Sequence, residues 1–332
     1  MSGIKKVVIL LLIILAPLTA LGQGPGESFE EMIRRVEWPN TDFSITLVDL
    51  DEIHHGGPAK DGIPAIDDPK FVPVRLIKNI AGTEPVITVE INGEARAYPF
   101  RVLMFHEIVN DKIRGVPITI TFCPLCNTAI VFSREIEGRV LDFGVTGWLR
   151  NSDLVMYDRQ TESWWQQFTG RAIIGEMASQ TLTKIPARIE SFANFKKRYP
   201  QGDVLVPNKP GRRDYGVNLY EGYDALPRPF YQLKDFPENI KPMARVVTVE
   251  NRAWALTLVR KVGKIVTEDG LVITWEEGQN SALDSRRIDQ GHDVGNVLVQ
   301  KKTETGLKDV VYGVDFAFAF HAFYPDSPII VK

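Results

Sequence analysis

The chain has 332 residues, of which 44% are hydrophobic and 24% charged, with 26 Gly, 21 Pro and 2 Cys. This composition excludes a disordered, collagen-like or disulfide-rich chain. The 39 basic and 42 acidic residues nearly balance, which argues against a nucleic-acid partner. The length suits one large domain or two of ordinary size.

The N-terminal segment has the features of a secretory signal peptide. Two lysines precede an apolar run over 7–15, and the small residues Ala20 and Gly22 follow it. The run is shorter than the ~20 residues that a membrane-spanning helix needs. We therefore expect residues 1–22 to be a signal peptide. The mature protein would then be periplasmic or secreted, with no membrane span after cleavage.

Strand signals dominate the chain after this segment. Short runs rich in β-branched residues occur at 45–49, 85–90, 118–122 and 129–132. Asn92-Gly93 predicts a two-residue β-hairpin turn. Helical patterns are scarcer and are best at 100–109 and at 190–199, where Ser191 can cap the helix and Pro200 ends it. The alternation of Phe and Ala before His321 predicts another strand. We expect a mainly β fold with a few minor helices.

Two parts of the chain resemble each other across a Pro/Gly-rich segment at 206–242. Thr121-Phe-Cys-Pro-Leu-Cys-Asn-Thr-Ala aligns without gaps with Thr274-Trp-Glu-Glu-Gly-Gln-Asn-Ser-Ala, and His106-Glu-Ile-Val aligns with Gly263-Lys-Ile-Val. We predict two related β units from an internal duplication. The first covers 23–205, the connection covers 206–242, and the second, degenerate unit covers 243–332.

The second unit lacks the reactive residues of the first. It keeps the apolar strand positions but has no counterpart of Cys123, Cys126 or His106. A single site that is present once in a duplicated scaffold would produce this pattern. The comparison therefore groups His106 with the two cysteines.

The Cys123-Pro-Leu-Cys126 segment has four interpretations. It can turn two thiolates toward one metal ion, form a redox pair that cycles without metal, supply a nucleophile with His106 as its base, or form a disulfide that staples a loop. The redox interpretation lacks a helix starting at Cys123 that would lower the pKa of its thiol. Asn127 follows the pair where covalent haem attachment needs His, so haem is excluded. No phosphate-binding GxxxxGK[ST] motif indicates a nucleotide.

Our leading hypothesis is an extracytoplasmic metal-binding protein. Cys123, Cys126 and His106 would hold zinc or copper, because these metals accept sulfur and imidazole ligands. Glu107 would be a fourth ligand or would orient the imidazole. An open coordination position would make the site catalytic, with an oxidoreductase as one option, and a closed one would make it structural.

Two other classes stay open. The first is a metal-free thiol–disulfide oxidoreductase that uses the same cysteines with a redox partner. The second is a non-enzymatic module that binds a small ligand or has a structural role, with the disulfide as a staple. Trp164 and Trp165 are adjacent, so they face opposite sides of a strand and one of them can line a ligand pocket.

Five long motifs are typical of one protein family. They are Gly56-Gly-Pro-Ala-Lys-Asp-Gly-Ile-Pro-Ala-Ile-Asp-Asp-Pro-Lys-Phe, Ala97-Tyr-Pro, His106-Glu-Ile-Val-Asn-Asp, Thr121-Phe-Cys-Pro-Leu-Cys-Asn-Thr-Ala and Leu154-Val-Met-Tyr-Asp-Arg-Gln-Thr-Glu-Ser-Trp-Trp-Gln-Gln-Phe-Thr-Gly. Over roughly residues 50 to 325 the chain resembles domain-of-unknown-function family 3179 of secreted bacterial and archaeal proteins. The resemblance implies no activity, but it implies signature positions at His106, Glu107, Cys123, Cys126, Lys60, Asp61, Tyr157, Trp164 and Trp165. We take Lys60, Asp61, Tyr157, Trp164 and Trp165 as candidates for supporting the metal ligands or binding a ligand.

Overall fold

A computed structural model describes residues 28–230 and 235–332, so the predicted signal peptide lies outside the described residues. The described residues divide into two compact units, the first ending at Pro39 and the second starting at Asn40. In the first unit, helix α1 (Phe29–Glu37) begins with a capping box, in which the Ser28 hydroxyl accepts from the backbone N–H of Glu31 and the Glu31 carboxylate accepts from that of Ser28. Within the described ranges, no helix is long and apolar enough to cross a membrane.

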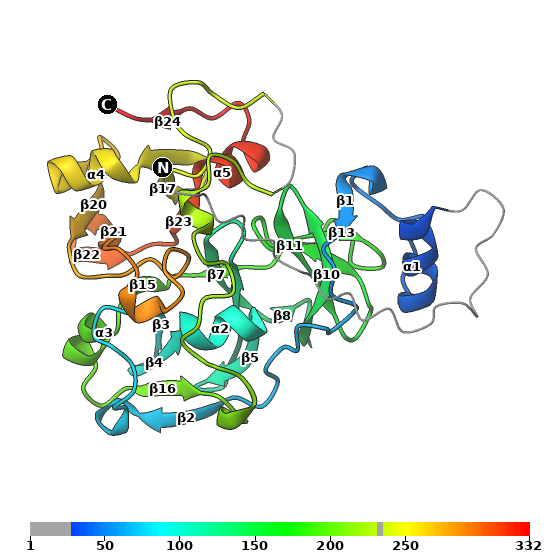
Figure 1. The fold of residues 1–332 in the computed structure, drawn as a ribbon, viewed down its shortest axis with the longest axis horizontal. Coiled ribbons are helices and arrows are strands. Elements are labelled where there is room, and N and C mark those ends of the chain that lie inside the picture. Colours follow the sequence, from blue (N-terminus) through cyan, green and yellow to red (C-terminus); the bar gives the residue numbers. More distant parts are fainter. Residues whose placement is uncertain (1–27, 231–234) are drawn as a thin grey trace, which may run out of the picture. The chain divides into compact units, whose positions relative to one another are not determined.

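The second unit is mainly β with short helices, as predicted, and its strands form small sheets (Figure 1). One five-stranded sheet contains Asp153, Tyr157, Trp164 and Trp165. Its strands, in spatial order, are β1 (Ile53–His55), β10 (Phe143–Arg150), β11 (Asp153–Asp158), β12 (Trp164–Gln166) and β13 (Arg171–Ile174). A two-stranded hairpin lies between β7 and β10 in sequence and consists of β8 (Glu135–Ile136) and β9 (Arg139–Val140).

The N-terminal half contributes two further sheets. The first has the order β15 (Arg188–Ser191), β3 (Pro85–Ile91), β4 (Glu94–Pro99), β16 (Asp203–Val206) and β2 (Lys70–Pro73). The second has the order β14 (Lys184–Ile185), β7 (Thr128–Ser133), β6 (Val116–Cys123) and β5 (Ile108–Ile113). Helix α2 (Phe100–His106) connects β4 of the first sheet to β5 of the second, and α3 (Phe192–Arg198) connects β15 and β16 of the first sheet.

The C-terminal half repeats this order of pairing. One of its sheets is β23 (Gly313–Phe316), β17 (Arg245–Val249), β18 (Arg252–Ala255) and β24 (Ile329–Ile330), and the other is β19 (Lys264–Val266), β20 (Leu271–Glu276), β21 (Asn296–Thr303) and β22 (Gly306–Asp309). Helices α4 (Leu256–Val262) and α5 (Ala317–Phe323) follow β18 and β23 as α2 and α3 follow β4 and β15. A duplication would produce this shared order, and the duplication itself stays a prediction.

Local signals account for several elements. At the β3–β4 turn, Asn92 and Gly93 both have positive φ, 50° and 81°, as the predicted two-residue hairpin requires. The helix predicted at 190–199 is α3, and the Ser191 hydroxyl caps it by accepting from the N–H of Asn194. Val206 ends strand β16, and the rest of the described part of 206–242 contains two short 3-10 helices, Pro210–Arg212 and Tyr223–Ala225, and no strand.

Two predicted strands are wrong. In the segment 45–49 only Thr46 forms an isolated bridge, to Ile174, because β-branched residues build a strand only where a partner strand runs alongside. The Phe/Ala alternation before His321 lies in helix α5, whose residues Ala317 to His321 are all buried. A segment that is buried on all sides carries no periodicity that separates helix from strand.

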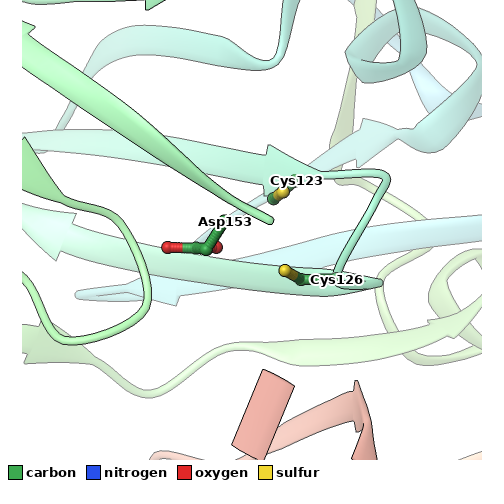
Figure 2. Close-up of side chains that lie close together, drawn as sticks. All are labelled: Cys123, Cys126 and Asp153. Carbon is green, nitrogen blue, oxygen red and sulfur yellow. The ribbon is translucent and has the colours of Figure 1, made fainter. Parts of the chain in front are cut away.

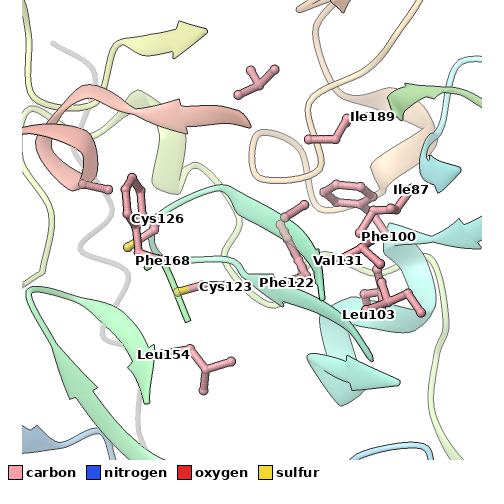
Figure 3. Close-up of a cluster of buried hydrophobic side chains, with 14 of the residues drawn as sticks. Ile87, Phe100, Leu103, Phe122, Cys123, Cys126, Val131, Leu154, Phe168 and Ile189 are labelled. Carbon is pink, nitrogen blue, oxygen red and sulfur yellow. The ribbon is translucent and has the colours of Figure 1, made fainter. Parts of the chain in front are cut away.

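One apolar core joins both halves of the second unit. It includes Phe122 of β6 and Phe316 of β23, and β23 lies next to β7 (Figure 1). Both cysteines belong to the same core, with Phe168 near Cys126 (Figure 3). The CxxC segment therefore lies inside the protein, where water does not compensate charge.

Candidate metal site

The cysteines lie at the tip of the β6–β7 hairpin. Cys123 is the last residue of β6 and pairs with Thr128, the first residue of β7. Between them, the N–H of Asn127 donates to the Pro124 carbonyl, and Asn127 has a φ of 52°, which Asn tolerates better than most residues. This tight turn brings both thiols to the same end of the hairpin.

A second hairpin, β10–β11, supplies a carboxylate to the same place. Its two turn residues, Asn151 and Ser152, have φ values of 55° and 64°, which is the type I′ pattern of a two-residue turn. The turn presents the Ser152 carbonyl to both thiols, with Cys126 Sγ donating at 3.3 Å and Cys123 Sγ at 3.7 Å. Asp153 follows as the first residue of β11.

The side chains of Cys123, Cys126 and Asp153 converge (Figure 2). Their sulfur and carboxylate atoms all lie within 4.8 Å of one another, and the cysteines are not joined in a disulfide. Ligands of a tetrahedral ion with bonds of about 2.0–2.3 Å are separated by roughly 3.3–3.8 Å, so small rotations would close the group around an ion.

The Asp153 carboxylate is only half satisfied. Its Oδ2 accepts from Gln166 Nε2 at 2.7 Å and from the N–H of Phe168 at 2.9 Å. Its Oδ1 is buried and has no hydrogen-bond partner among the described residues. An unpaired buried carboxylate oxygen costs free energy, and a bound cation would offset this cost.

Burial disfavours negative charge throughout this group. It raises the pKa of Asp153 to about 7 and that of nearby Asp315 to about 6. Burial also raises the pKa of the Cys123 thiol and, more strongly, that of the Cys126 thiol. Lys184, the cation that acts on Asp153 and Asp315, has its own pKa lowered by burial. A divalent cation would reverse these shifts by compensating the ionised ligands.

Glu107 occupies a strained position beside the cysteines. It is the C-cap of α2 and has a φ of 56°, an uncommon region for a residue with a Cβ. In the other half, Gly263 caps α4 with a φ of 71°, and the N–H groups of Phe122 and Trp275 bond to Glu107 and Gly263 respectively. Glu107 and Gly263 thus occupy the same position at the ends of α2 and α4. The sequence alignment paired Gly263 with His106 instead, which is one residue away.

The Glu107 carboxyl group is buried next to the candidate ligands. Burial and the Asp153 charge together raise its pKa to about 8. Glu107 and Cys123 line one cavity of about 60 Å³, and a water molecule needs at least ~10–15 Å³ of such volume. Glu107 thus places a proton-holding group beside a space that can admit water.

The structure does not bring His106 into the sulfur group. Its Nδ1 lies 2.8 Å from the Pro64 carbonyl oxygen and its Nε2 lies 2.9 Å from the Tyr215 hydroxyl. The group of possible metal ligands around the sulfurs contains Asp153 and not His106. His106 and Glu107 line different cavities, and Asp153 is the third residue that the structure groups with the sulfurs.

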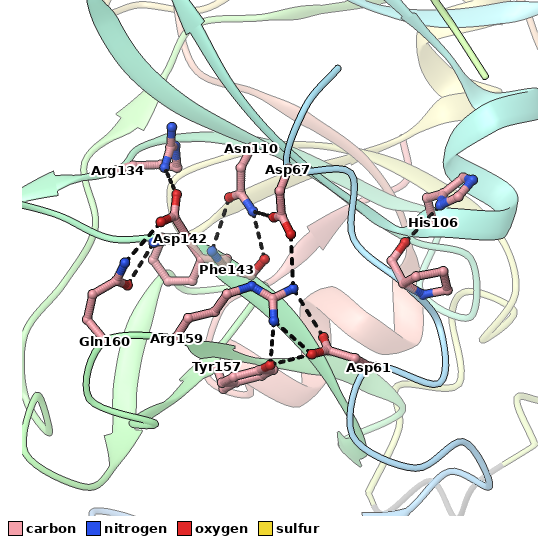
Figure 4. Close-up of polar contacts among 11 residues, drawn as sticks. Asp61, Asp67, His106, Asn110, Arg134, Asp142, Phe143, Tyr157, Arg159 and Gln160 are labelled. Atoms are coloured by element: carbon pink, nitrogen blue, oxygen red, sulfur yellow. Dashed lines mark hydrogen bonds and ion pairs between the residues drawn. The ribbon is translucent and has the colours of Figure 1, made fainter. Parts of the chain in front are cut away.

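The other predicted residues form a separate network. The Asp61 carboxylate accepts from the Tyr157 hydroxyl at 2.6 Å and from Arg159 Nη1 at 2.7 Å (Figure 4). Lys60 Nζ lies 2.6 Å from a carboxylate oxygen of Glu162. Lys60, Asp61 and Tyr157 therefore lie together, but they do not belong to the sulfur group.

Both tryptophans are core residues. Trp164 and Trp165 are fully buried in β12 and contact different aromatic neighbours, Trp148 and Phe143 respectively. They face opposite sides of the strand, as predicted, but neither of them lines any of the described pockets.

Asp153 is the residue that the sequence reasoning missed. It comes directly before the Leu154 motif, and Asn151-Ser152 before it is a turn signal. These signals predict a hairpin but do not show that its turn packs on the cysteine hairpin.

A second group of possible ligands comprises Asp224, Asp284 and His292. Here the charges already have partners, since Arg245 pairs with Asp224 at 2.9 Å and His292 lies 3.2 Å from Asp284. The sulfur group is therefore the better candidate for a metal.

Fold and site define a mainly β protein with a buried cluster of two thiols and a carboxylate that could hold a metal ion. Residues 60–327 match the model of a family described as a protein of unknown function (DUF3179), and the chain belongs to this family. No curated protein and no solved structure matches the chain.

Proposed function

We propose that this chain is an extracytoplasmic metal-binding protein, with zinc or copper held by Cys123, Cys126 and Asp153. The observation that carries the proposal is the approach of two sulfur atoms and a carboxylate within 4.8 Å in the core. Two thiolates and one carboxylate are a ligand set that zinc accepts, and thiolates also favour copper. The extracytoplasmic location rests on the predicted signal peptide at 1–22.

The surroundings favour a site with an open position. Catalytic zinc sites commonly have three protein ligands and one exchangeable water. The cavity of about 60 Å³ beside Cys123 offers space for that water, and Glu107 in its wall can accept or donate a proton. We therefore propose metal-assisted chemistry with Glu107 as its acid–base group.

The thiol–disulfide alternative has less support. Cys123 ends a strand instead of beginning a helix, so no helix N-terminus stabilises its thiolate. Both thiols are buried and have raised pKa values, whereas reactive thiols are partly exposed and have lowered ones. A metal would lower these pKa values by binding the thiolates.

Metal content and free thiols, measured together, test the proposal. The mature protein is purified without chelators and analysed by elemental mass spectrometry and by thiol titration after unfolding. We expect one zinc or copper per chain and two titratable thiols once the metal is removed. Metal-free protein that takes up neither zinc nor copper(I) would contradict the proposal.

Variants distinguish the ligand sets. Cys123→Ser and Asp153→Asn should each weaken metal binding at least ~10-fold, because each removes a charged ligand. Asp158→Asn is the matched control, because Asp158 is equally buried at the other end of β11 and bonds Trp165 instead of the sulfurs. Loss of metal in His106→Ala, with retention in Asp153→Asn, would restore the ligand set that the sequence predicted.

A further inference from the structure

A larger cavity lies beside the Asp61 network. Its volume is about 480 Å³, within the ~300–1,000 Å³ that is typical of small-ligand sites. Its walls come from the loop 61–67, from His106 at the end of α2 and from the segment 208–215. None of the sulfur-group residues lines it.

The acidic wall of this cavity is compensated by one arginine. Arg159 contacts Asp61 at 2.7 Å and Asp67 at 3.4 Å (Figure 4). Asn110 Nδ2 also donates to Asp67 at 2.7 Å, and Tyr157 donates to Asp61. The two carboxylates are thus held within the protein's own network.

The part of the cavity lined by the segment 208–215 carries positive charge that no ion pair compensates among the described residues. Lys209, Arg212 and Arg213 line it, and none of the three has an ion pair with an acidic side chain in the described ranges. The guanidinium of Arg213 lies over the ring of Phe105 at 5.7 Å, which holds it without neutralising its charge. Three cations against two carboxylates that already share Arg159 leave the cavity positive.

The segment 208–215, which carries these three basic residues, is held in place at both ends. Asn208 Nδ2 donates to the Asp68 carbonyl at 2.9 Å. At the other end, the Pro64 carbonyl can only accept, so His106 Nδ1 donates to it, and His106 Nε2 forms a hydrogen bond of 2.9 Å with the Tyr215 hydroxyl. These two hydrogen bonds of His106 fix the segment against α2.

We propose that this cavity binds a small anion through a phosphate or carboxylate group that pairs with Arg212 and Arg213. Arginine suits this role because its planar guanidinium donates two parallel hydrogen bonds to either group. The volume admits a metabolite-sized molecule, and the Tyr215–His106 pair gives the site a polar end. This site is independent of the metal proposal.

Calorimetric titration of the mature protein tests the proposal. Inorganic phosphate and succinate are titrated separately at constant ionic strength, with sodium chloride as the reference salt. We expect saturable binding of at least one of them, and the tighter one identifies the chemical class. The double variant Arg212→Gln/Arg213→Gln should bind it at least tenfold more weakly, while Arg171→Gln, an exposed arginine outside the cavity, should bind as the wild type does.

Histidine NMR gives a second measurement that needs no arginine variant. In wild-type protein the ring signals of His106, assigned with His106→Gln, should shift on titration, while those of exposed His292 should not. Absence of saturable binding of both anions, equal binding by the double variant, or unmoved His106 signals would each overturn the proposal. Unchanged anion binding in Cys123→Ser would keep this result separate from the metal site.

Discussion

Glu107 combines a buried carboxyl group with an uncommon backbone conformation. Its φ is 56°, and no arginine or lysine forms an ion pair with it among the described residues. Residues in such conformations persist where the surrounding structure holds them, and they cluster at functional sites. We infer that Glu107 is retained for its carboxyl group and not for stability.

The pKa of Glu107 predicts how the stability of metal-free protein depends on pH. Its value rises from 4.5 to about 8 on folding, so the folded state holds the proton more tightly than the unfolded state. The contribution of Glu107 protonation to the free energy of unfolding is therefore greatest below about pH 4.5 and is lost as the pH rises through 8. Relative to Glu107→Gln, the wild type should therefore lose at least about 1 kcal/mol of unfolding free energy between pH 5 and 8. Urea denaturation in the presence of a chelator measures this, and a parallel pH dependence of the two proteins would contradict it.

At the scale of elements, the equivalent caps of α2 and α4 show the backbone strain that accompanies Glu107. Helices α2 and α4 end at Glu107 and Gly263 with nearly the same backbone angles, ψ being −34° and −32°. Glycine adopts positive φ without steric cost, whereas glutamate does not. The half without cysteines thus has the relaxed cap, and the half with cysteines has the strained one.

Exchanging the cap residues should shift stability in opposite directions. Glu107→Gly should raise the unfolding free energy of metal-free protein by about 1 kcal/mol, because it relieves the positive φ. Gly263→Ala should lower it by about 1 kcal/mol, since open space surrounds the added Cβ and only the backbone strain counts. Urea denaturation monitors both, and a destabilised Glu107→Gly protein would mean that the carboxyl group supports the fold.

At the scale of the whole second unit, the cysteine turn links the two halves. Asn127 Nδ2 donates to the Val314 carbonyl at 2.6 Å, and the N–H of Phe316 donates to the Cys126 carbonyl at 2.9 Å. Arg188 and Asp309 form an ion pair between the same halves at 2.5 Å. The site residues therefore hold together parts of the chain that are distant in sequence.

Removing the Asn127 side chain should weaken this link without straining the turn. Asn127→Gly keeps the positive φ and removes the hydrogen bond to buried Val314, so we expect a loss of about 1–2 kcal/mol. Asn92→Gly, at an exposed turn with a φ of 50°, is the control and should change stability by less than about 0.5 kcal/mol. The unfolding of each variant is followed by circular dichroism and by tryptophan fluorescence, which should report one common transition. If the two variants were equally stable, the Asn127–Val314 hydrogen bond would not contribute to holding the halves together.

Short-range signals account for what the sequence alone determined. The mainly β class, the Asn92-Gly93 turn, the Ser191 cap and the CxxC turn between two strands all depend on residues a few positions apart. Backbone preferences and side-chain caps act over that range, so they can be recognised without a partner element. The Phe/Ala segment of α5 misled because burial on all sides removes periodicity.

Tertiary packing alone decided the composition of the candidate site. Asp153 meets the sulfurs because the Asn151-Ser152 turn packs against the tip of another hairpin, and no local pattern encodes that contact. The same packing turns His106 toward Tyr215 and Glu107 toward Cys123, although the two residues are adjacent. The sequence identified the two cysteines, but only the folded chain could add Asp153 to them and leave out His106, since a ligand set depends on distances between segments that are far apart in sequence.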